Sequence, residues 1–161
     1  MNPSADPDIQ FLREAIRLSR EHMMKGDGGP FGSVVVLDGK VVGEGWNRVL
    51  STYDPTAHAE IVAIRDAGQR LSRYTLEGCV LYASCEPCPM CLAAAYWARV
   101  DRLVFAASRQ DAAASGFDDE YLYLEIPKKH TERALPARQL LQEEARKAFT
   151  QWLAKPDRVC Y

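Results

Sequence analysis

Two short segments of this sequence contain residues that bind metals and transfer protons. One alanine separates His58 from Glu60, and two residues separate Cys88 from Cys91. One imidazole and two thiolates form a typical zinc ligand set, and a catalytic zinc site keeps its fourth position for water. Glu60 lies close to this set without being needed as a ligand, so we expect it to transfer protons.

The order H-x-E followed by P-C-x-x-C is typical of zinc-dependent deaminases that act on nucleobases. Zinc lowers the pKa of a bound water to about 7, which makes hydroxide available at neutral pH. Glu60 would take the proton and return it first to a ring nitrogen and then to the leaving amine. We therefore expect one zinc ion per subunit with a bound water or hydroxide, held by His58, Cys88 and Cys91.

A closed structural zinc site is the alternative, with a fourth protein ligand such as Cys85. The sequence has no second, separate C-x-x-C or H-x-x-x-H pair to complete such a site. His130 is too isolated to be a ligand, and we expect His22 to be a solvated or capping residue of a helix. The pattern favours an open catalytic site over a zinc module or scaffold without activity.

The elements that position these residues follow from periodicity and turn signals. Asp6 and Pro7 predict the start of a helix that Gly26 ends. Apolar runs at residues 33–37 and 41–46 flank an Asp-Gly turn and predict a hairpin. The other predicted elements are a helix from about Pro55 to Gly68, a strand at 79–83, a helix at 87–99, strands at 102–106 and 137–141, and a helix at 143–154.

Two of these helices are expected to begin at the zinc ligands. His58 and Cys88 fall in the first turns of their helices, where the positive end of the helix dipole stabilises thiolates. Residues two apart point about 200° apart around a regular helix. His58 and Glu60 can therefore converge only on a metal that lies beyond the helix end.

Strands that alternate with helices predict one layered α/β domain over residues 1–161, with a sheet covered on both faces and at least partly parallel. Twenty basic and twenty-two acidic residues give a formal charge of −2, which favours neither nucleic acid nor an anionic membrane as a partner. No signal peptide or membrane span is apparent, and five cysteines fit metal ligation in a reducing cytosol better than a disulfide framework. We expect a cytoplasmic protein.

Several further segments carry a resemblance to a known family: residues 29–32, Asn47, residues 55–60, 84–91, 96–99 and 116–119, and Tyr161. In these segments the chain resembles the bacterial guanine deaminases of the cytidine-deaminase superfamily. The resemblance implies a three-layer α/β/α sandwich with a five-stranded mixed sheet, and a homodimer in which the C-terminal segment can be exchanged. It also implies zinc-dependent hydrolysis of guanine, a purine base, to xanthine and ammonia.

The same resemblance implies roles for the residues that would contact the substrate. Asn47 and Asp119 would read the edge of the base, and Tyr161 would contribute to the closed pocket. Phe31 and Trp97 are candidates for packing on the ring. A carboxylate accepts hydrogen bonds from the N1 and amine donors of guanine, and an amide side chain both donates and accepts. Asp119 is also a candidate for proton transfer.

Each of these residues has a purely structural alternative. Asn47 follows a hairpin and fits a turn or cap, and Asp119 fits a loop or helix cap. Phe31 and Trp97 fit the core, where aromatic residues usually lie. Tyr161 fits a disordered end, although the two preceding apolar residues favour docking.

Two other deaminases share the zinc chemistry. An adenosine deaminase acting on tRNA would need a basic surface, and the charge of −2 and the acidic stretch at residues 118–125 argue against it. A cytosine or other free-base deaminase would differ only in its pocket residues, and other aminated rings such as triazines could enter the same pocket.

Overall fold

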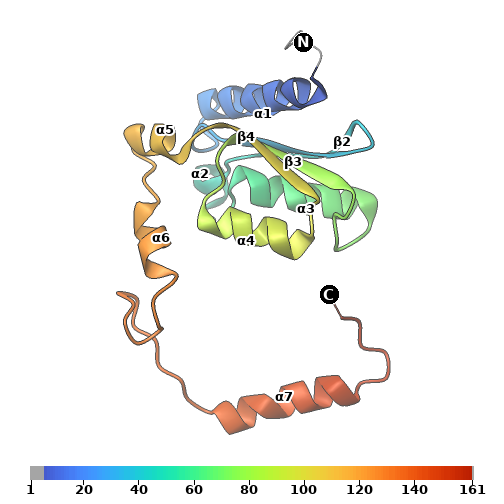
Figure 1. The fold of residues 1–161 in the computed structure, drawn as a ribbon, viewed down its shortest axis with the longest axis vertical. Coiled ribbons are helices and arrows are strands. Elements are labelled where there is room, and N and C mark those ends of the chain that lie inside the picture. The colour runs from blue at the N-terminus through green and yellow to red at the C-terminus, as the bar shows by residue number, and fades with distance from the viewer. Residues whose placement is uncertain (1–5, 161) are drawn as a thin grey trace. The chain divides into compact units, whose positions relative to one another are not determined.

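The computed structural model describes residues 6–160, and the chain divides into two compact units, Met1–Asp119 and Glu120–Tyr161 (Figure 1). Among the described residues, the first unit contains a β-sheet and five helices, and the second contains two helices. The prediction of one deaminase domain over residues 1–161 stays a prediction. None of the described helices is long and apolar enough to cross a membrane.

The sheet of the first unit has four strands in the order β2-β1-β3-β4. Their bounds are Gly32–Leu37 for β1, Lys40–Trp46 for β2, Cys79–Cys85 for β3 and Arg102–Ala107 for β4. β1 pairs antiparallel with β2 and β3, whereas β3 and β4 are parallel. Asp38 and Gly39 connect β1 to β2 with φ of 49° and 72°, the conformation of a tight hairpin turn. The predicted hairpin is confirmed.

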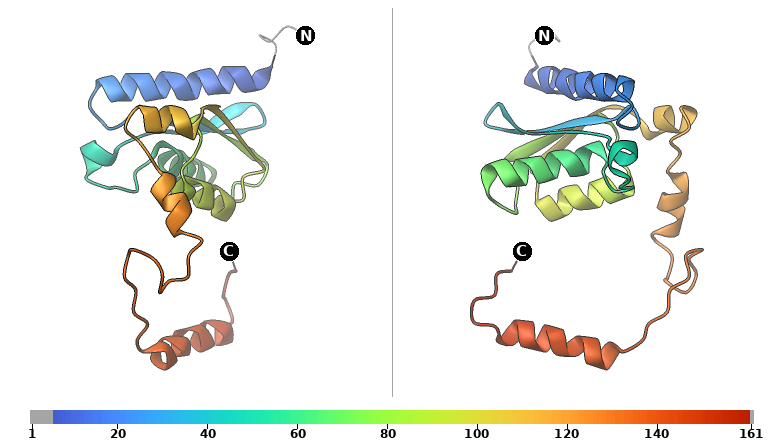
Figure 2. Two further views of the ribbon diagram at one scale, coloured as in Figure 1. Left: turned by 60° about the vertical axis from the view of Figure 1, so that its left-hand side comes forward. Right: turned by 180° about the vertical axis from the view of Figure 1, so that it is seen from behind.

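Helices cover both faces of this sheet (Figures 1 and 2). α1 lies on one face and packs on β1 and β3, while α3 and α4 lie on the other. The helices of the first unit are α1 (Pro7–Met24), α2 (Val49–Thr52), α3 (Ala59–Leu71), α4 (Pro89–Ala98) and α5 (Arg109–Ala114), and those of the second are α6 (Glu120–Glu125) and α7 (Gln142–Ala154). The three-layer α/β/α arrangement agrees with the predicted fold class.

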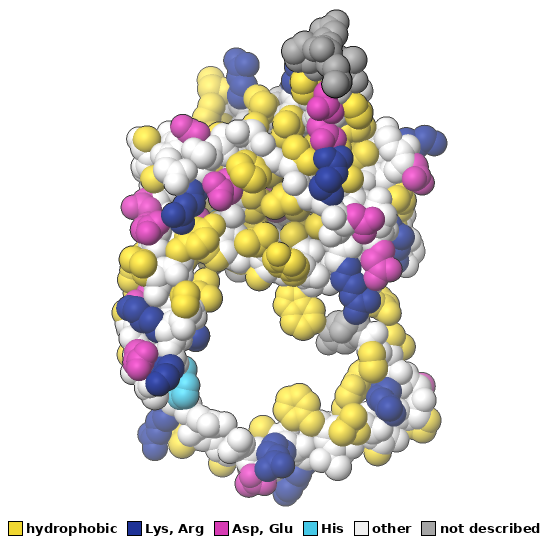
Figure 3. All heavy atoms as spheres, in the orientation of Figure 1, with side chains coloured by type: hydrophobic (Ala, Val, Ile, Leu, Met, Phe, Trp, Pro, Cys, Tyr) yellow, Lys and Arg dark blue, Asp and Glu magenta, His cyan; other side chains and the backbone are white. Residues whose placement is uncertain are grey.

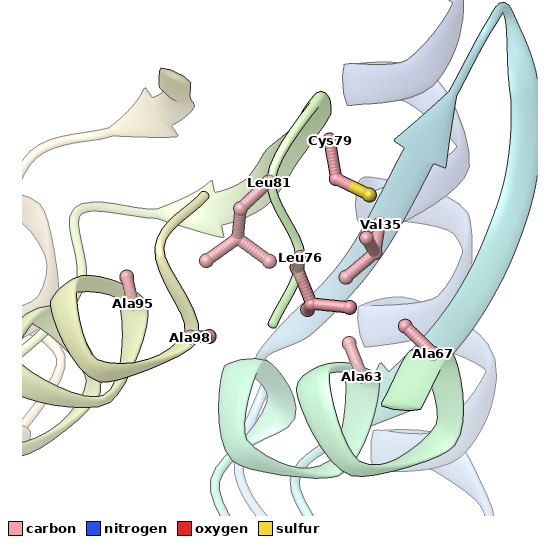
Figure 4. Packing of buried hydrophobic residues seen from close by; sticks show 8 residues of the cluster. All are labelled: Val35, Ala63, Ala67, Leu76, Cys79, Leu81, Ala95 and Ala98. Carbon is pink, nitrogen blue, oxygen red and sulfur yellow. The ribbon is translucent and has the colours of Figure 1, made fainter. Parts of the chain in front are cut away.

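Small residues let α3 pack closely on the sheet. The core between the sheet and the helices α3 and α4 is formed by Val35, Ala63, Ala67, Leu76, Cys79, Leu81, Ala95 and Ala98 (Figure 4). On β2, a Cβ at Gly45 would lie 2.1 Å from the carbonyl oxygen of Ala59, and one at Gly43 would lie 2.5 Å from that of Ala63. Any side chain at these two positions would push α3 away from β2.

The prediction of a five-stranded sheet is wrong for the described residues, which form four strands. Residues 137–141, predicted as a strand, have no regular structure, and Leu141 at their end has a left-handed backbone with φ of 55°. A strand needs a neighbour for its backbone hydrogen bonds, and the described residues of the second unit contain no strand. The helices α2, α5 and α6 were not predicted, because each has only four to six residues.

Large hydrophobic side chains are exposed on both units. On the first unit they include Tyr96 and Trp97 of α4 and Phe105 of β4, and Figure 3 shows hydrophobic side chains gathered on the face where these elements lie. None of the described residues 120–160 is buried, and Phe149 and Leu153 of α7 are 70% and 65% exposed. Exposed apolar surfaces of this kind typically mark interaction sites.

Candidate metal centre and active site

The segment before α3 forms a turn that ends at His58. The Asp54 carboxylate accepts hydrogen bonds from the backbone N–H and the hydroxyl of Thr56, at 2.8 and 2.7 Å. The backbone N–H of Arg48 donates to the carbonyl of Ala57 at 2.9 Å. His58 is the N-cap of α3 and has an extended backbone, with φ −69° and ψ 157°. Its imidazole is therefore held at the end of the helix.

Cys88 has the same position on α4. It is the N-cap of this helix, again with an extended backbone, at φ −63° and ψ 167°. The loop before it is fixed to the end of β4, because the N–H of Glu86 donates to the carbonyl of Ala107 at 2.8 Å and the Glu86 carboxylate accepts from the N–H of Arg109 at 3.1 Å. Cys91 follows in the first turn of α4 and is buried.

These two helix ends bring three donor groups together. His58 Nδ1 lies 3.6 Å from the Sγ atoms of both Cys88 and Cys91, and all three donor atoms lie within 4.8 Å of one another. One imidazole nitrogen and two sulfurs, largely shielded from solvent, are the donors that zinc prefers. The residues present fit a zinc ion.

The two thiols differ in acidity. Hydrogen bonds with the Cys91 thiol and with His58 hold the pKa of Cys88 at about 4. The hydrogen bond that Cys91 donates to this thiolate, together with burial, raises the pKa of Cys91. The hydrogen bond with Cys88 raises the pKa of His58. The Cys91 proton lies in the hydrogen bond to the Cys88 thiolate. A metal bound by both sulfurs would take the place of this proton, so metal binding releases protons.

Glu60 lies in the first turn of α3 and is only 6% exposed. Burial raises the pKa of its carboxyl, and a hydrogen bond with Cys91 opposes this shift. A carboxyl with a raised pKa beside the metal ligands is suited to take up and release a proton. The cluster of donor atoms consists of His58, Cys88 and Cys91 and does not include Glu60, so the Glu60 carboxyl is available for proton transfer.

The predicted position of His58 within the first turn of its helix is wrong. Helical geometry would direct His58 and Glu60 about 200° apart, but His58 precedes the helix and has an extended backbone. Its side chain is therefore free of the helical repeat, and both residues can face Cys91. Cys88 was likewise expected in the first turn and is the N-cap.

Cys85, the candidate for a fourth ligand, is directed elsewhere. Its thiol donates to the carbonyl of Ser108 at 3.5 Å, and burial raises the pKa of Cys85 to about 11. Within the described residues, the metal-binding cluster does not include it. The arrangement supports an open site with three protein ligands.

Asn47 is buried beside the segment that carries His58, with 7% of its surface exposed. Its Oδ1 accepts hydrogen bonds from the backbone N–H groups of Gly29 and Val49, both at 3.2 Å. Its own N–H donates to the carbonyl of Phe31 at 3.0 Å. Asn47 thus has the turn-forming role that the sequence offered as an alternative to base recognition. Because Oδ1 accepts these two hydrogen bonds, the Nδ2 donor is directed away from the backbone groups.

Asp119 is the last residue of the first unit and is half-buried. Burial raises the pKa of its carboxyl, the negative charge of Cys88 raises it further, and the charge of Arg109 opposes both. Asp119 therefore lies within electrostatic range of the zinc ligands. The influence of Arg109 on Asp119 was not predicted from the sequence, because Arg109 belongs to no recognised motif.

The predicted ring-packing residues lie in different surroundings. Phe31 is half-buried and meets Phe117 edge to face, with ring centroids 5.0 Å apart. Phe117 belongs to the segment that resembles the guanine deaminases, but its contact with Phe31 was not predicted. Trp97 is 73% exposed near the C-terminal end of α4, and Tyr161 lies outside the described residues. The roles proposed for these residues stay predictions.

A layered α/β fold that holds one histidine, two cysteines and a buried glutamate is the architecture of a zinc-dependent deaminase. Residues 5–107 match the family described as the cytidine and deoxycytidylate deaminase zinc-binding region. The chain belongs to this family. The matched region includes Asn47, Glu60 and all three zinc ligands, whereas Asp119 lies beyond it.

Within the family, the chain is similar to the guanine deaminase of Bacillus subtilis, at 49% identity over 88% of this chain and 91% of that protein. The X-ray structure of that enzyme superposes with a TM-score of 0.92 and 45% identity, covering 100% of this chain and 99% of that one. A solved relative in complex with 2,6-diaminopurine has a TM-score of 0.66 and 36% identity, covering 71% of this chain and 64% of that one. The tRNA-specific adenosine deaminase of Haemophilus influenzae is 40% identical over 71% of this chain and 68% of its own length. The predicted resemblance to bacterial guanine deaminases is confirmed.

We predict that zinc content separates the ligands from the neighbouring thiol. Cys91→Ala should lose most of its bound zinc, because one of the three donors is removed. Cys85→Ala should retain about one zinc ion per chain, since that thiol faces Ser108. Elemental analysis of the purified variants checks both. Loss of zinc from Cys85→Ala would instead support the alternative of a structural site with Cys85 as a fourth ligand.

Proposed function

We propose that this protein hydrolyses guanine to xanthine and ammonia. The buried carboxyl of Glu60 beside the His58, Cys88 and Cys91 group is the observation that carries the deamination chemistry. The choice of guanine is supported by the similarity to the Bacillus subtilis enzyme, which extends over almost the whole of both chains.

Zinc, held by His58, Cys88 and Cys91, would lower the pKa of a water molecule to about 7 and so supply a nucleophile at neutral pH. Glu60 accepts one proton of the attacking water and delivers it to N3 of guanine as oxygen bonds to C2. It then carries the second proton to the exocyclic amine, the C2–N bond breaks, and ammonia leaves. Both protons of water are thus accounted for, one on xanthine N3 and one on ammonia.

Asn47 and Asp119 would select the base by its edge. Guanine presents donors at N1 and the exocyclic amine, and acceptors at O6 and N7. Nδ2 of Asn47 is a donor that suits the acceptors, because Oδ1 already accepts two backbone hydrogen bonds. The Asp119 carboxylate suits the donors. A base without these groups would leave the polar side chains of the pocket unpaired, which disfavours its binding.

Adenosine deamination in tRNA is the second candidate, favoured by the similarity to the Haemophilus influenzae enzyme. That similarity covers a smaller share of both chains than the similarity to the guanine deaminase. The formal charge of −2 and the acidic residues between 118 and 125 also disfavour a long polyanion as substrate.

The exposed apolar surfaces support a homodimer. Tyr96 and Trp97 of α4 are 77% and 73% exposed, and the residues of α7 in the second unit are exposed along its length. A second copy of the chain would cover these surfaces, and the resemblance to the family implies that the C-terminal segment takes part in the exchange.

For the catalytic step, we predict that Glu60→Gln retains zinc and loses about 10²–10⁴-fold in kcat, because its amide cannot accept and return the proton. Mass spectrometry of products from guanine, adenine, cytosine, their nucleosides and tRNA identifies the substrate. Glu77→Gln, an exposed glutamate on the surface, is the matched control. Turnover of tRNA but of no free base would replace guanine with the second candidate.

For base selection, we predict that Asp119→Asn lowers kcat/KM for guanine about 10- to 100-fold, because a charge-assisted hydrogen bond is replaced by a neutral one. Steady-state kinetics on the zinc-loaded protein measures the effect. Asp118→Asn removes the same charge from the neighbouring residue and should stay close to wild type. Equal losses in both variants would remove the specific role of Asp119.

For the assembly, we predict a mass in solution of two chains by light scattering, with Trp97→Glu shifting the protein toward single chains. A charge on the exposed face of α4 would have to be buried in the interface, which is costly. A wild-type protein that remains a single chain at micromolar concentration would contradict the homodimer.

A further inference from the structure

The last turn of α1 carries a histidine that contacts two segments bordering the site. The ring of His22 stacks on the indole of Trp46, with centroids 3.6 Å apart and an angle of 12° between planes. Its Nδ1 lies 2.7 Å from Oδ2 of Asp27. Only 13% of the His22 side chain is exposed. The expectation of a solvated histidine is therefore wrong, whereas its place in the last turn of α1 agrees with the alternative of a capping residue.

Both residues that His22 contacts are connected to Asn47. Trp46 precedes Asn47 in the chain and is the last residue of β2. Asp27 begins the segment 27–31, in which Gly29 donates to Asn47 Oδ1 and the carbonyl of Phe31 accepts from the Asn47 backbone. The segment also lies close against Asn47, since a Cβ at Gly28 would be 2.1 Å from Asn47 Oδ1.

The segment 27–31 is fixed at its start by the pair of His22 and Asp27. The hydrogen bond from His22 lowers the pKa of the Asp27 carboxyl, so this carboxyl is an ionised acceptor. Asp27 also accepts a backbone hydrogen bond from Ser51 at 3.1 Å through its carbonyl. Its side chain is thereby tied to α1 and its backbone to α2.

The orientation of the Asn47 amide depends on the placement of Gly29. An amide side chain has one end that accepts and one that donates, and the two backbone donors Gly29 and Val49 select Oδ1 for their side. Nδ2 is then the end presented to a substrate. If the segment 27–31 moves, one of these donors is lost and the amide is free to rotate.

We propose that His22 is a positioning residue for substrate binding: it holds the segment 27–31 so that Asn47 presents its Nδ2 donor to the base. This inference rests on the proposed function, because it assigns Asn47 to the edge of guanine. His22 acts on the base through Asp27, Gly29 and Asn47.

The test uses variants that separate the two contacts of His22. His22→Phe keeps a ring to stack on Trp46 and removes the donor to Asp27, while Asp27→Asn weakens the same pair from its other side. Asn47→Asp keeps the acceptor for both backbone N–H groups and removes the Nδ2 donor. His130→Phe, at an exposed position of the second unit, is the matched control.

We expect the KM for guanine to rise about 10-fold in His22→Phe, the equivalent of one hydrogen bond, with kcat and zinc content close to wild type. The double variant His22→Phe with Asn47→Asp should be no worse than Asn47→Asp alone, because both changes remove the same interaction. Effects that multiply, or a KM in His22→Phe equal to that of His130→Phe, would overturn the proposal.

Amide hydrogen exchange gives a readout that does not depend on turnover. Gly29 N–H is hydrogen-bonded to Asn47 Oδ1, so its exchange in an NMR experiment should accelerate about 10-fold in His22→Phe and in Asp27→Asn. Unchanged exchange in both variants would refute the positioning role. If wild-type protein does not act on guanine, the proposed function fails, and the exchange rates still decide whether His22 holds the segment.

Discussion

The close approach of α3 to β2 is the constraint on which the site depends. Gly43 and Gly45 leave room for the helix backbone where any side chain would collide with it. Because the first turn of α3 is pressed against the strand, Glu60 is buried and His58, at the helix end, is directed toward α4. The buried Glu60 carboxyl and His58 of the metal-binding cluster are therefore placed by the same packing contact.

Burial raises the pKa of two carboxyl groups of the first unit, Glu60 and Asp119. The surroundings of these two groups differ. Glu60 is hydrogen-bonded to Cys91 at the metal centre, whereas Asp119 is half-buried and is opposed by the charge of Arg109. Unpaired buried charges are costly. The fold retains both groups, and their different partners suit them to the separate roles proposed for them, proton transfer for Glu60 and base recognition for Asp119.

Local signals predicted much of the fold correctly. The start of α1 and the β1–β2 hairpin each follow from residues adjacent in the chain, Asp6 with Pro7 and Asp38 with Gly39. Residues 137–141 were also predicted as a strand, yet a strand requires a partner, and partners are set by tertiary contacts. The shortest helices escaped prediction because one or two turns contain too little periodicity.

The sequence by itself determined the chemistry of this protein, since an imidazole, two thiols and a carboxyl at characteristic spacings are sufficient to indicate zinc and proton transfer. Only the tertiary structure decided how these groups are oriented: His58 as an N-cap outside the helical repeat, Cys85 turned to Ser108, and the amide of Asn47 aligned by two backbone donors. The physical reason is that side-chain direction and burial depend on backbone conformation at helix ends and on contacts between segments far apart in the chain. A spacing motif contains neither.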